Sequence, residues 1–415
     1  MDRRLCLALS ISAAAALLAG CGGSESSIAP VHAAPDRAVS SSSSYRVLYN
    51  FPGSADDGYY PQAGLIELNG TFYGTTAKGG SACAFSRSGC GTVFGLSASG
   101  TEKVLHSFLG TDGFSPAVPL LKANGALYGT TQRGGNSPSG KDCGTVFRIS
   151  PKGHMQVLHV FGKWPDGCRP EGPLLDVNGT FYGTTLYGGE GSNGTVYSIT
   201  ANGREQVLHS FCSDSDDGCQ PVGGLIDVDG TLYGTASSDG SACHCGIVYS
   251  ITPSGSETQL YHFAGGSDGA VPQAGLVSAD GTLYGTTLLG GGSGCAVGHG
   301  CGTIYSVTTS GAEQVVHRFT GGKSDGAWPK AALLYVKGIF YGTTSAGGRP
   351  GGRCQHDGCG TIFNFTPSGG EKMLFDFKST FSHHPEASLI DVNNVLYGTT
   401  TLRGGSAFTF TPTQQ

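Results

Sequence analysis

The sequence is poor in charged residues and in residues that favour helices. Lys, Arg, Asp and Glu make up 13% of the 415 residues, and there are only 3 Met. The formal net charge of −6 leaves no basic field, so we expect no nucleic-acid partner. Strong helix formers are scarce, which argues against a helix-rich fold. The chain also lacks a Gly-X-Y period, which argues against collagen.

Glycine and aromatic residues are what the chain has in abundance. The 71 Gly and 19 Pro together exceed a fifth of the residues, a bias that can accompany low complexity. However, 17 Tyr and 20 Phe are spread along the whole chain, and a disordered tract would lack them. The composition therefore predicts many short strands joined by tight turns.

The first 20 residues have the pattern of an export signal. Asp2, Arg3 and Arg4 precede a mostly apolar run, Leu5–Leu18, which is too short for a stable membrane span. The run ends in Leu-Ala-Gly followed by Cys21, which resembles the lipobox of bacterial lipoproteins. The resemblance implies that Cys21 is acylated and becomes the first residue; the alternative is an ordinary secretory signal. Gly22 would be the second residue of the mature chain, and by the same resemblance it implies location in the outer membrane.

Residues 21–44 read as a tether, and residues 45–415 as the folded part. The tether is rich in Ser and Ala and has nothing to bury. We therefore expect a monomeric protein of the cell envelope, held at the membrane through its N-terminal lipid only, on the periplasmic side or at the cell surface.

The folded part contains seven copies of one unit. Tyr-Gly-Thr-Thr, or Tyr-Gly-Thr-Ala, recurs at spacings of 51 to 57 residues, a period typical of propellers and repeat arrays. The copies begin at Tyr73, Tyr128, Tyr182, Tyr233, Tyr284, Tyr341 and Tyr397.

Each unit reads as four antiparallel strands. In the fourth unit, 224–228 and 231–235 flank the turn signal Asp229-Gly230, and two further strands are expected at 247–251 and 259–263. The chain opens on a segment like the fourth strand (45–51) and ends on one like the third (406–411). Their pairing would close a ring, whereas an open solenoid would need capping ends. We predict an all-β, seven-bladed β-propeller of four-stranded blades.

The recurring segments Gly-Thr-Leu-Tyr-Gly-Thr-Thr, Gly-Thr-Val-Tyr-Ser-Ile-Thr and Val-Leu-His-Ser-Phe resemble the GloVer tandem-repeat family, the choice-of-anchor repeat proteins. The resemblance covers about residues 45–411. It implies no particular activity.

Twelve cysteines remain once Cys6 and Cys21 are set aside, an even number that suits an oxidising compartment. Five pairs are expected within single loops, and the sixth between two loops on one face. The expected pairs are Cys83–Cys90, Cys212–Cys219, Cys295–Cys301, Cys354–Cys359, Cys243–Cys245 and Cys143–Cys168. The alternative is a metal site using His244, His299 or His356, but each loop offers only three irregularly spaced ligands. We therefore expect no metal and no cofactor.

No catalytic constellation stands out. Five histidines recur near the end of the fourth strand, shortly before a Phe, and such repetition favours a role in the scaffold, packed or hydrogen-bonded between blades. They are His106, His159, His209, His262 and His317. The hydroxyl groups of Tyr-Gly-Thr-Thr are expected to bond backbone groups of the loops.

The pattern Asp-Gly-x-x-Pro precedes the first strand in six units. Turn chemistry explains it; the alternative is a ring of carboxylates at one mouth of the channel. The aspartates are Asp57, Asp112, Asp166, Asp217, Asp268 and Asp325. The residue before each Pro varies, and such a set suits contact with a sugar or peptide. Candidate contacts among these are Tyr60, Arg169, Gln220, Trp328 and His384, with His383 beside the last because the seventh unit lacks Asp-Gly.

Two classes of function follow. The first is a binding or scaffold protein that presents a disulfide-stiffened face to a glycan, peptide or protein. The second is an envelope lyase or hydrolase that acts on a polymer at the same face, using His383 or His384 with a nearby Asp; the fold cannot choose between them. We expect the ligand on the face with the long loops, at Trp328 and Tyr60, because the turns on the other face are too small for a pocket.

Overall fold

The structure is a computed structural model that describes residues 43–413 with gaps, and Ser42–Gln415 make one compact unit. The predicted signal peptide, Cys21 and the tether up to residue 42 lie outside the described residues. No helix among the described residues is long and apolar enough to cross a membrane. The gaps are 55–56, 82, 84–85, 137–141, 163, 213–216, 241–243, 293–294, 296–298, 351–353, 355–357 and 379–382.

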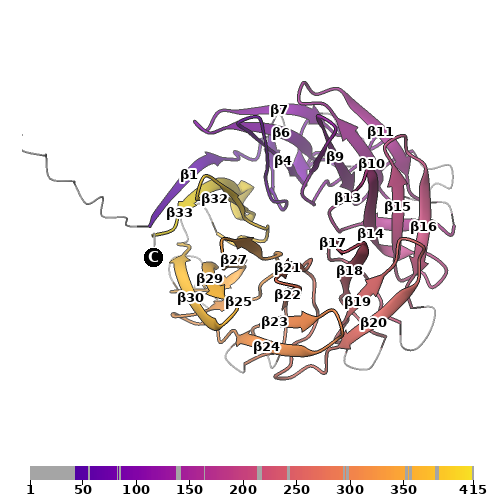
Figure 1. The fold of residues 1–415 in the computed structure, drawn as a ribbon. Coiled ribbons are helices and arrows are strands. Elements are labelled where there is room, and N and C mark those ends of the chain that lie inside the picture. Colours follow the sequence, from indigo (N-terminus) through magenta and orange to yellow (C-terminus); the bar gives the residue numbers. More distant parts are fainter. Residues whose placement is uncertain are drawn as a thin grey trace, which may run out of the picture. The chain divides into compact units, whose positions relative to one another are not determined.

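Seven antiparallel sheets surround a common axis, so the predicted seven-bladed propeller is confirmed (Figure 1). Within the first six blades the strands run in chain order from the inner to the outer edge. Blades one to three contain β3 (Ile66–Leu68), β4 (Thr71–Thr76), β6 (Thr92–Ser97) and β7 (Glu102–Ser107); β8 (Leu121–Ala123), β9 (Ala126–Thr131), β10 (Thr145–Ile149) and β11 (Met155–Val160); β13 (Leu175–Val177), β14 (Thr180–Gly188), β15 (Thr195–Thr200) and β16 (Glu205–Ser210).

Blades four to six continue the same order. They contain β17 (Ile226–Val228), β18 (Thr231–Ala236), β19 (Ile247–Ile251) and β20 (Glu257–His262); β21 (Val277–Ala279), β22 (Thr282–Thr287), β23 (Thr303–Thr308) and β24 (Glu313–Arg318); β26 (Leu334–Val336), β27 (Ile339–Thr344), β29 (Thr361–Thr366) and β30 (Gly369–Asp376).

The seventh blade joins the two ends of the folded chain. It contains β31 (Ile390–Val392), β32 (Val395–Thr400), a short 3-10 turn η2 (Leu402–Gly404) and β33 (Ser406–Thr411). Its outer strand is β1 (Ser44–Asn50), which pairs antiparallel with β33, from Ser44 opposite Thr411 to Asn50 opposite Ser406. The predicted closure is therefore present, and neither of these strands is left as a raw edge.

Aromatic pairs form the core between neighbouring blades. A buried Phe just after each outer strand meets the ring of an aromatic residue on the third strand of the next blade, edge to face, with centroids 4.9–5.4 Å apart. This geometry suits the charge distribution of aromatic rings. The pairs are Phe51–Phe94, Phe108–Phe147, Phe161–Tyr197, Phe211–Tyr249, Phe263–Tyr305, Phe319–Phe363 and Phe377–Phe408.

The Tyr-Gly-Thr-Thr motif is explained by these rings. A Cβ on Gly74 would lie 2.6 Å from Cζ of Phe94, so only glycine fits there. The hydroxyl of Thr76 donates to the carbonyl of Lys78 and lies 2.8 Å from the hydroxyl of Thr92. The hydroxyl of Thr399 donates to Ala63 in the first blade. These hydroxyl groups bond the backbone as expected, whereas the buried hydroxyl groups of Thr75, Thr130 and Thr286 in the same motif have no hydrogen-bond partner among the described residues.

The blade connections emerge on two opposite faces, because strand direction alternates. We call the face with the loops between second and third strands and between blades the loop face. The hairpin face carries the short turns, in which Asn69, Asp229 and their equivalents have positive φ as a two-residue hairpin requires. On the loop face, β2 (Gly58–Tyr59) pairs with β5 (Lys78–Gly79), β25 (Gly326–Ala327) with β28 (Ala346–Gly347), and β12 (Gly167–Pro170) with the end of β14.

Candidate functional site

Five disulfides join loops on the loop face. Four of them close short loops, and the fifth, between Cys143 and Cys168, ties a loop within the second blade to the connection into the third blade. All five match pairs expected from the sequence: Cys83–Cys90, Cys143–Cys168, Cys212–Cys219, Cys295–Cys301 and Cys354–Cys359. The sixth expected pair includes Cys243, which lies outside the described residues. Five disulfides fit an oxidising, extracytoplasmic location.

The aspartates of Asp-Gly-x-x-Pro do not form the carboxylate ring that the sequence suggested at a channel mouth. Each lies beside the outer strand of the preceding blade, where its carboxylate is engaged by a side chain of that strand. Four face His Nε2 at 2.9–3.4 Å, and two accept a hydrogen bond from a Tyr hydroxyl at 2.6 and 2.9 Å. The pairs are His106–Asp112, His159–Asp166, His209–Asp217, His317–Asp325, Tyr49–Asp57 and Tyr261–Asp268.

Backbone contacts complete the turn around each carboxylate. Asp112 accepts from the amide of Leu109, and Asp325 accepts from the amide and hydroxyl of Thr320 and from the amide of Gly326. The aspartates therefore stabilise turns at the outer rim of the blades, away from the central channel. This repeated contact also places four of the five histidines in the scaffold, as expected.

His262 is the exception, because it stands one residue before Phe263 rather than two. Tyr261 occupies the equivalent position and bonds Asp268. The side chain of His262 instead lies against Asp239, 2.5 Å from its carboxylate, and is 44% exposed. His262 was grouped with the other four because all five are histidines near the end of the outer strand, although His262 stands one residue closer to its Phe.

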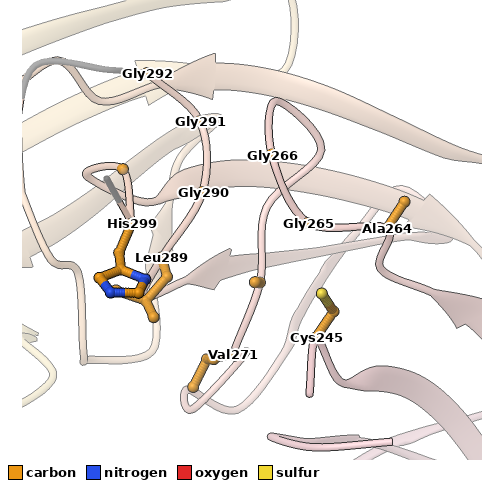
Figure 2. A pocket seen from close by; sticks show the side chains of 12 residues that line it. Cys245, Ala264, Gly265, Gly266, Val271, Leu289, Gly290, Gly291, Gly292 and His299 are labelled. Atoms are coloured by element: carbon orange, nitrogen blue, oxygen red, sulfur yellow. The ribbon is translucent and has the colours of Figure 1, made fainter. Parts of the chain in front are cut away.

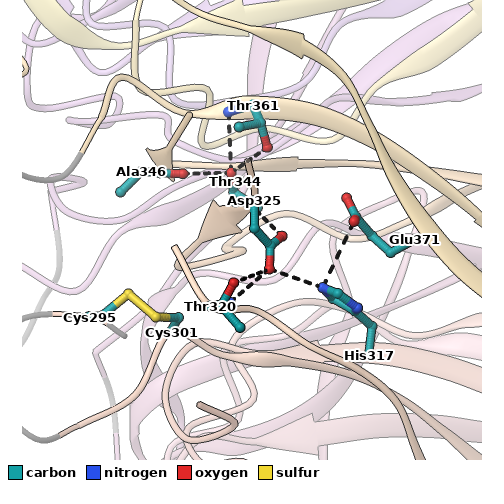
Figure 3. A network of polar contacts seen from close by, with 10 residues as sticks. Cys295, Cys301, His317, Thr320, Asp325, Thr344, Ala346, Thr361 and Glu371 are labelled. Atoms are coloured by element: carbon teal, nitrogen blue, oxygen red, sulfur yellow. Dashed lines mark hydrogen bonds and ion pairs between the residues drawn. A yellow bond between two sulfur atoms is a disulfide. The ribbon is translucent and has the colours of Figure 1, made fainter. Parts of the chain in front are cut away.

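A glutamate from the next blade reaches most of these pairs. In Figure 3, Nε2 of His317 lies between Asp325, at 3.4 Å, and Glu371 of β30, at 3.9 Å. Burial raises the pKa of Glu371 to about 7, with the charge of Asp325 adding to the effect and His317 opposing it. Burial would also raise the pKa of Asp325, but hydrogen bonds from His317 and Thr320 outweigh it and lower the pKa. Glu102, Glu205, Glu257 and Glu313 share the position and the raised pKa.

Three of these clusters bring ligand-type atoms within 4.8 Å of one another, as a metal site would: His159–Asp166–Glu205, His209–Asp217–Glu257 and His317–Asp325–Glu371. Their repetition along the rim favours a structural role. Among the described residues, neither His244 nor His299 takes part in any cluster of this kind, and His356 lies outside them.

The residues before each Pro all have left-handed backbone conformations. Their φ values lie between 58° and 68°, which is strained for side chains such as that of Val271. Two backbone hydrogen bonds hold Trp328: its amide donates to Cys301 and its carbonyl accepts from Ser345. The candidate contacts at these positions are all half-buried: Tyr60, Arg169, Gln220, Trp328 and His384. They lie at the seams between blades.

The residue after each Pro lines the central channel instead. One such residue from every blade surrounds a cavity of about 250 Å³ at the loop face, together with Val118 and Gln132. We call these seven the mouth residues: Gln62, Ala117, Glu171, Val222, Gln273, Lys330 and Glu386. These residues were not predicted from the sequence, because the candidates chosen there stand on the other side of the Pro. The signal was available, since they too vary within a repeated frame.

The charges at the mouth are arranged in two ion pairs. Nζ of Lys330 donates to Oε1 of Glu386 at 2.6 Å, and Nε of Arg169 lies 2.7 Å from Oε1 of Glu171. Burial nevertheless raises the pKa of Glu171, because it outweighs the lowering by Arg169. Arg169, which stands before a Pro, thus contacts the mouth residue Glu171. The mouth is polar and nearly charge-balanced, and its seven residues are of five types.

A larger cavity, of about 520 Å³, lies between the fourth and fifth blades on the loop face (Figure 2). Half of its twelve lining residues are glycine, so the walls are mainly backbone. His299 and Leu289 project from one side, while Cys245 belongs to the other. Because Cys245 is disulfide-bonded, His299 is the lining side chain that can exchange a proton.

His383 and His384 lie together at the seventh blade, with ring centroids 5.1 Å apart. His383 is 4% exposed, and neither of its ring nitrogens has a hydrogen-bond partner. Burial, with a contribution from His384, lowers the pKa of His383. Within the described part of the chain, their cluster contains Cys354 and no carboxylate, and Cys354 is bonded to Cys359.

The hairpin face also has a pocket, so the expectation that its turns are too small for one was wrong. A cavity of about 290 Å³ lies between the sixth and seventh blades. Its lining includes Lys337, Tyr341, Asp391 and Asn394, and Pro412 after the last strand. The strands of neighbouring blades, rather than the turns alone, supply its walls.

Comparison with known proteins bears on the repeats. The model of the Gloeobacter/Verrucomicrobia repeat matches residues 37–246 and 229–415. The chain belongs to this repeat family. The Gloeobacter/Verrucomicrobia repeat thus accounts for all seven blades, and the resemblance seen in the sequence is confirmed.

Similar proteins outside the repeat family are remote. No curated protein sequence matches the chain. A solved gluconolactonase from Xanthomonas campestris has 11% identity and a TM-score of 0.39, covering 65% of this chain and 78% of its own. A putative gluconolactonase has 11% identity and a TM-score of 0.41, covering 89% and 92%. These values carry no activity over to the Gloeobacter/Verrucomicrobia repeat protein.

Proposed function

We propose that this protein is a lipid-anchored binding protein of the cell envelope, which holds a small polar ligand at the channel mouth on its loop face. The observation that carries the proposal is the asymmetry of the mouth. Seven near-identical units build the scaffold, yet the residue after Pro takes five different types around the ring, with only Gln and Glu occurring twice. A surface that varies within a constant frame is where a repeat protein acquires specificity.

The chemistry of the mouth indicates the kind of ligand. Gln62, Gln132 and Gln273 offer both donors and acceptors. Lys330 and Glu386 already neutralise each other, so a strongly charged ligand would have to break that pair. A sugar unit or the zwitterionic end of a peptide suits such a lining, because both carry several hydrogen-bonding groups and little net charge.

The N-terminal segment supports the lipid anchor, and the disulfides support the compartment. Cys21 in its lipobox-like setting and the Ser-rich tether support attachment through lipid, and the disulfides fit the outside of the cytoplasm. The face that carries the mouth would be free to meet material of the envelope. An enzyme using His383 or His384 with a nearby Asp remains the second class.

The test uses protein that begins at Ser42 and therefore contains every strand of the ring. Melting would be followed with D-glucose, N-acetylglucosamine, glycine and dialanine as separate probes. A bound probe at a hundredfold excess over its Kd stabilises the folded state by about 2.7 kcal/mol. We expect at least one probe to raise the Tm, and Glu171→Gln with Gln273→Ala to abolish the rise.

The matched control is Glu190→Gln, an exposed acid on the loop face, which should behave as the parent. If no probe raises the Tm, or if the mouth variant responds as the parent does, the mouth is not a site for these ligands. Chemical conversion of a bound probe would instead favour the enzyme.

A further inference from the structure

Two aromatic side chains on the loop face remain open to solvent. Trp164 is 69% exposed and Tyr187 is 41% exposed; Leu109 is the only other large hydrophobic residue of the described chain that is exposed to this degree. Both aromatic residues line one cavity of about 260 Å³ between the second and third blades. Exposed aromatic area that gathers in one hollow points to a ligand.

Both side chains are departures from the repeat. Tyr187 occupies the position held by Lys78, Arg133, Ser238 and Leu289 in other units. It is carried there by β14, which runs nine residues where the second strands of the other blades have six. Trp164 is one of only two Trp in the chain. A scaffold role would repeat around the ring, whereas this pair occurs once.

The backbone beneath the two rings is held in place. Cys168 lies opposite Tyr187 in the pairing of β12 with β14 and is bonded to Cys143. Oδ2 of Asp166 accepts from the amide of Gly162 at 3.1 Å and faces Nε2 of His159 at 3.0 Å. Gly162, Asp166 and Cys168 are therefore held in place around Trp164, which lowers the entropy lost when a ligand binds.

The lining also limits what the cavity can take. Besides the two aromatic residues, its described lining contains Asp166, Ser192, the disulfide and glycines, and no Lys or Arg. An anionic ligand would meet the carboxylate of Asp166. A peptide strand would find the facing backbone already used, because Gly167 pairs with Gly188.

We propose that this aromatic cleft binds neutral pyranose sugars. The faces of a pyranose ring carry C–H groups that pack on Trp164 and Tyr187, while its hydroxyl groups can bond Ser192 and the backbone at the rim. The cavity is smaller than typical sites for drug-sized ligands, which suits one or two sugar units of a longer chain that continues into solvent. The cleft is separate from the mouth residues and does not depend on the function proposed for them.

The experiment measures binding of oligosaccharides to protein beginning at Ser42, by calorimetry and by the fluorescence of Trp164. The probes are the hexasaccharides of β-1,4-glucose, β-1,4-N-acetylglucosamine and α-1,4-glucose, with the hexamer of galacturonic acid as the acidic comparison. We expect at least one neutral hexasaccharide to bind with a Kd below about 1 mM, and the acidic hexamer to bind at least about tenfold more weakly.

Variants then locate the site. Trp164→Ala and Tyr187→Ala should each raise the Kd about tenfold, and Trp164→Phe should recover part of the loss. Because both side chains are exposed, the Tm should hardly change. Leu109→Ala, at an exposed hydrophobic residue in the corresponding loop one blade earlier, should bind as the parent does.

Three results would overturn the proposal: no neutral hexasaccharide binds, the acidic hexamer binds as tightly as the neutral ones, or both alanine variants keep the Kd within about twofold. Loss of binding with Glu171→Gln but not with Trp164→Ala would place the sugar at the mouth and refute the cleft. Equally, sugar binding that survives in Glu171→Gln while the small probes lose theirs would separate the two sites.

Discussion

Tyr45 of β1 stacks on Phe375 of β30, with ring centroids 4.5 Å apart and ring planes at 14°. These two residues stand where five of the other six junctions have a Glu and a His or Tyr; the junction of the first and second blades has Met155 in place of the Glu. The same junction is the one that lacks Asp-Gly, since the seventh unit has Phe381-Ser382 instead. An aromatic stack thus replaces a polar cluster as a whole. The break in the Asp pattern is explained by a change of packing and needs no ligand.

The first prediction concerns β1. This strand contacts three blades: it pairs with β33, places Tyr45 on Phe375 and places Phe51 on Phe94. Deleting Tyr45–Phe51 should therefore lower the Tm far more than deleting 22–44, and should promote aggregation through the freed edge of β33. Phe51→Ala alone should cost about 3–5 kcal/mol. Equal Tm values for the two deletions would contradict closure by β1.

Much of this fold could be predicted because the repeat makes its rules visible. The turn Asp229-Gly230, the strand lengths and the complementary ends all follow from local chemistry that recurs seven times. The pairing of the cysteines could be predicted as well, since short loops bring nearby cysteines together. The packing of Phe161 on Tyr197 could not be assigned in the same way, because periodicity does not say which blade a side chain faces.

The residues of the candidate sites were harder to predict from the sequence, for a specific reason. Trp328 and Tyr60 looked like contacts because they vary and are aromatic. However, the backbone at that position is left-handed, and it is the residue two positions on, after the Pro, that reaches the channel. Lys330 and Glu386 were therefore overlooked. Trp164 was overlooked because it belongs to no repeated pattern, and its exposure depends on how the loop folds.

The second prediction tests why glycine stands inside Tyr-Gly-Thr-Thr. Gly74→Ala would place a methyl group 2.6 Å from the ring of Phe94 and 3.0 Å from Leu65, so the core must shift, at a cost of about 1–3 kcal/mol. Gly95→Ala in the same blade is the control, because the nearest atom to its Cβ would be 3.5 Å away. Denaturant unfolding should show a lower midpoint for the first variant only.

The third prediction concerns Cys21, which lies outside the described residues. Cys21→Ser should move the protein from the membrane fraction to the soluble fraction while leaving its Tm unchanged, because the propeller does not include the tether. Fractionation without detergent provides the measurement, and deletion of 22–44 with Cys21 retained is the control, which should stay with the membrane. Persistent membrane association of Cys21→Ser would refute the lipid anchor.

The last prediction is a stability maximum in mildly acidic solution. The folded-state pKa of Glu371 is about 7, above its ordinary value of 4.5, so the folded protein holds this proton more tightly than the unfolded chain does. Its contribution is therefore fully present below about pH 4.5 and is lost as the pH rises through 7. Glu102, Glu205, Glu257 and Glu313 act in the same direction.

Asp112 and Asp325 act in the opposite direction. Their pKa values are lowered from 3.8, so the stability that they contribute is present above that value and is lost as the pH falls below it. The Tm should consequently peak between about pH 4.5 and 5.5 and decline toward pH 8. Glu371→Gln keeps the shape but cannot ionise, so at pH 8 it should be more stable than the parent by about 1–3 kcal/mol. At pH 5 the two should melt alike, and Glu190→Gln, at an exposed acid, should follow the parent throughout. A Tm that rises steadily from pH 5 to 8, or a Glu371→Gln variant that loses stability at pH 8, would show that the buried glutamates are ionised at no cost to the fold.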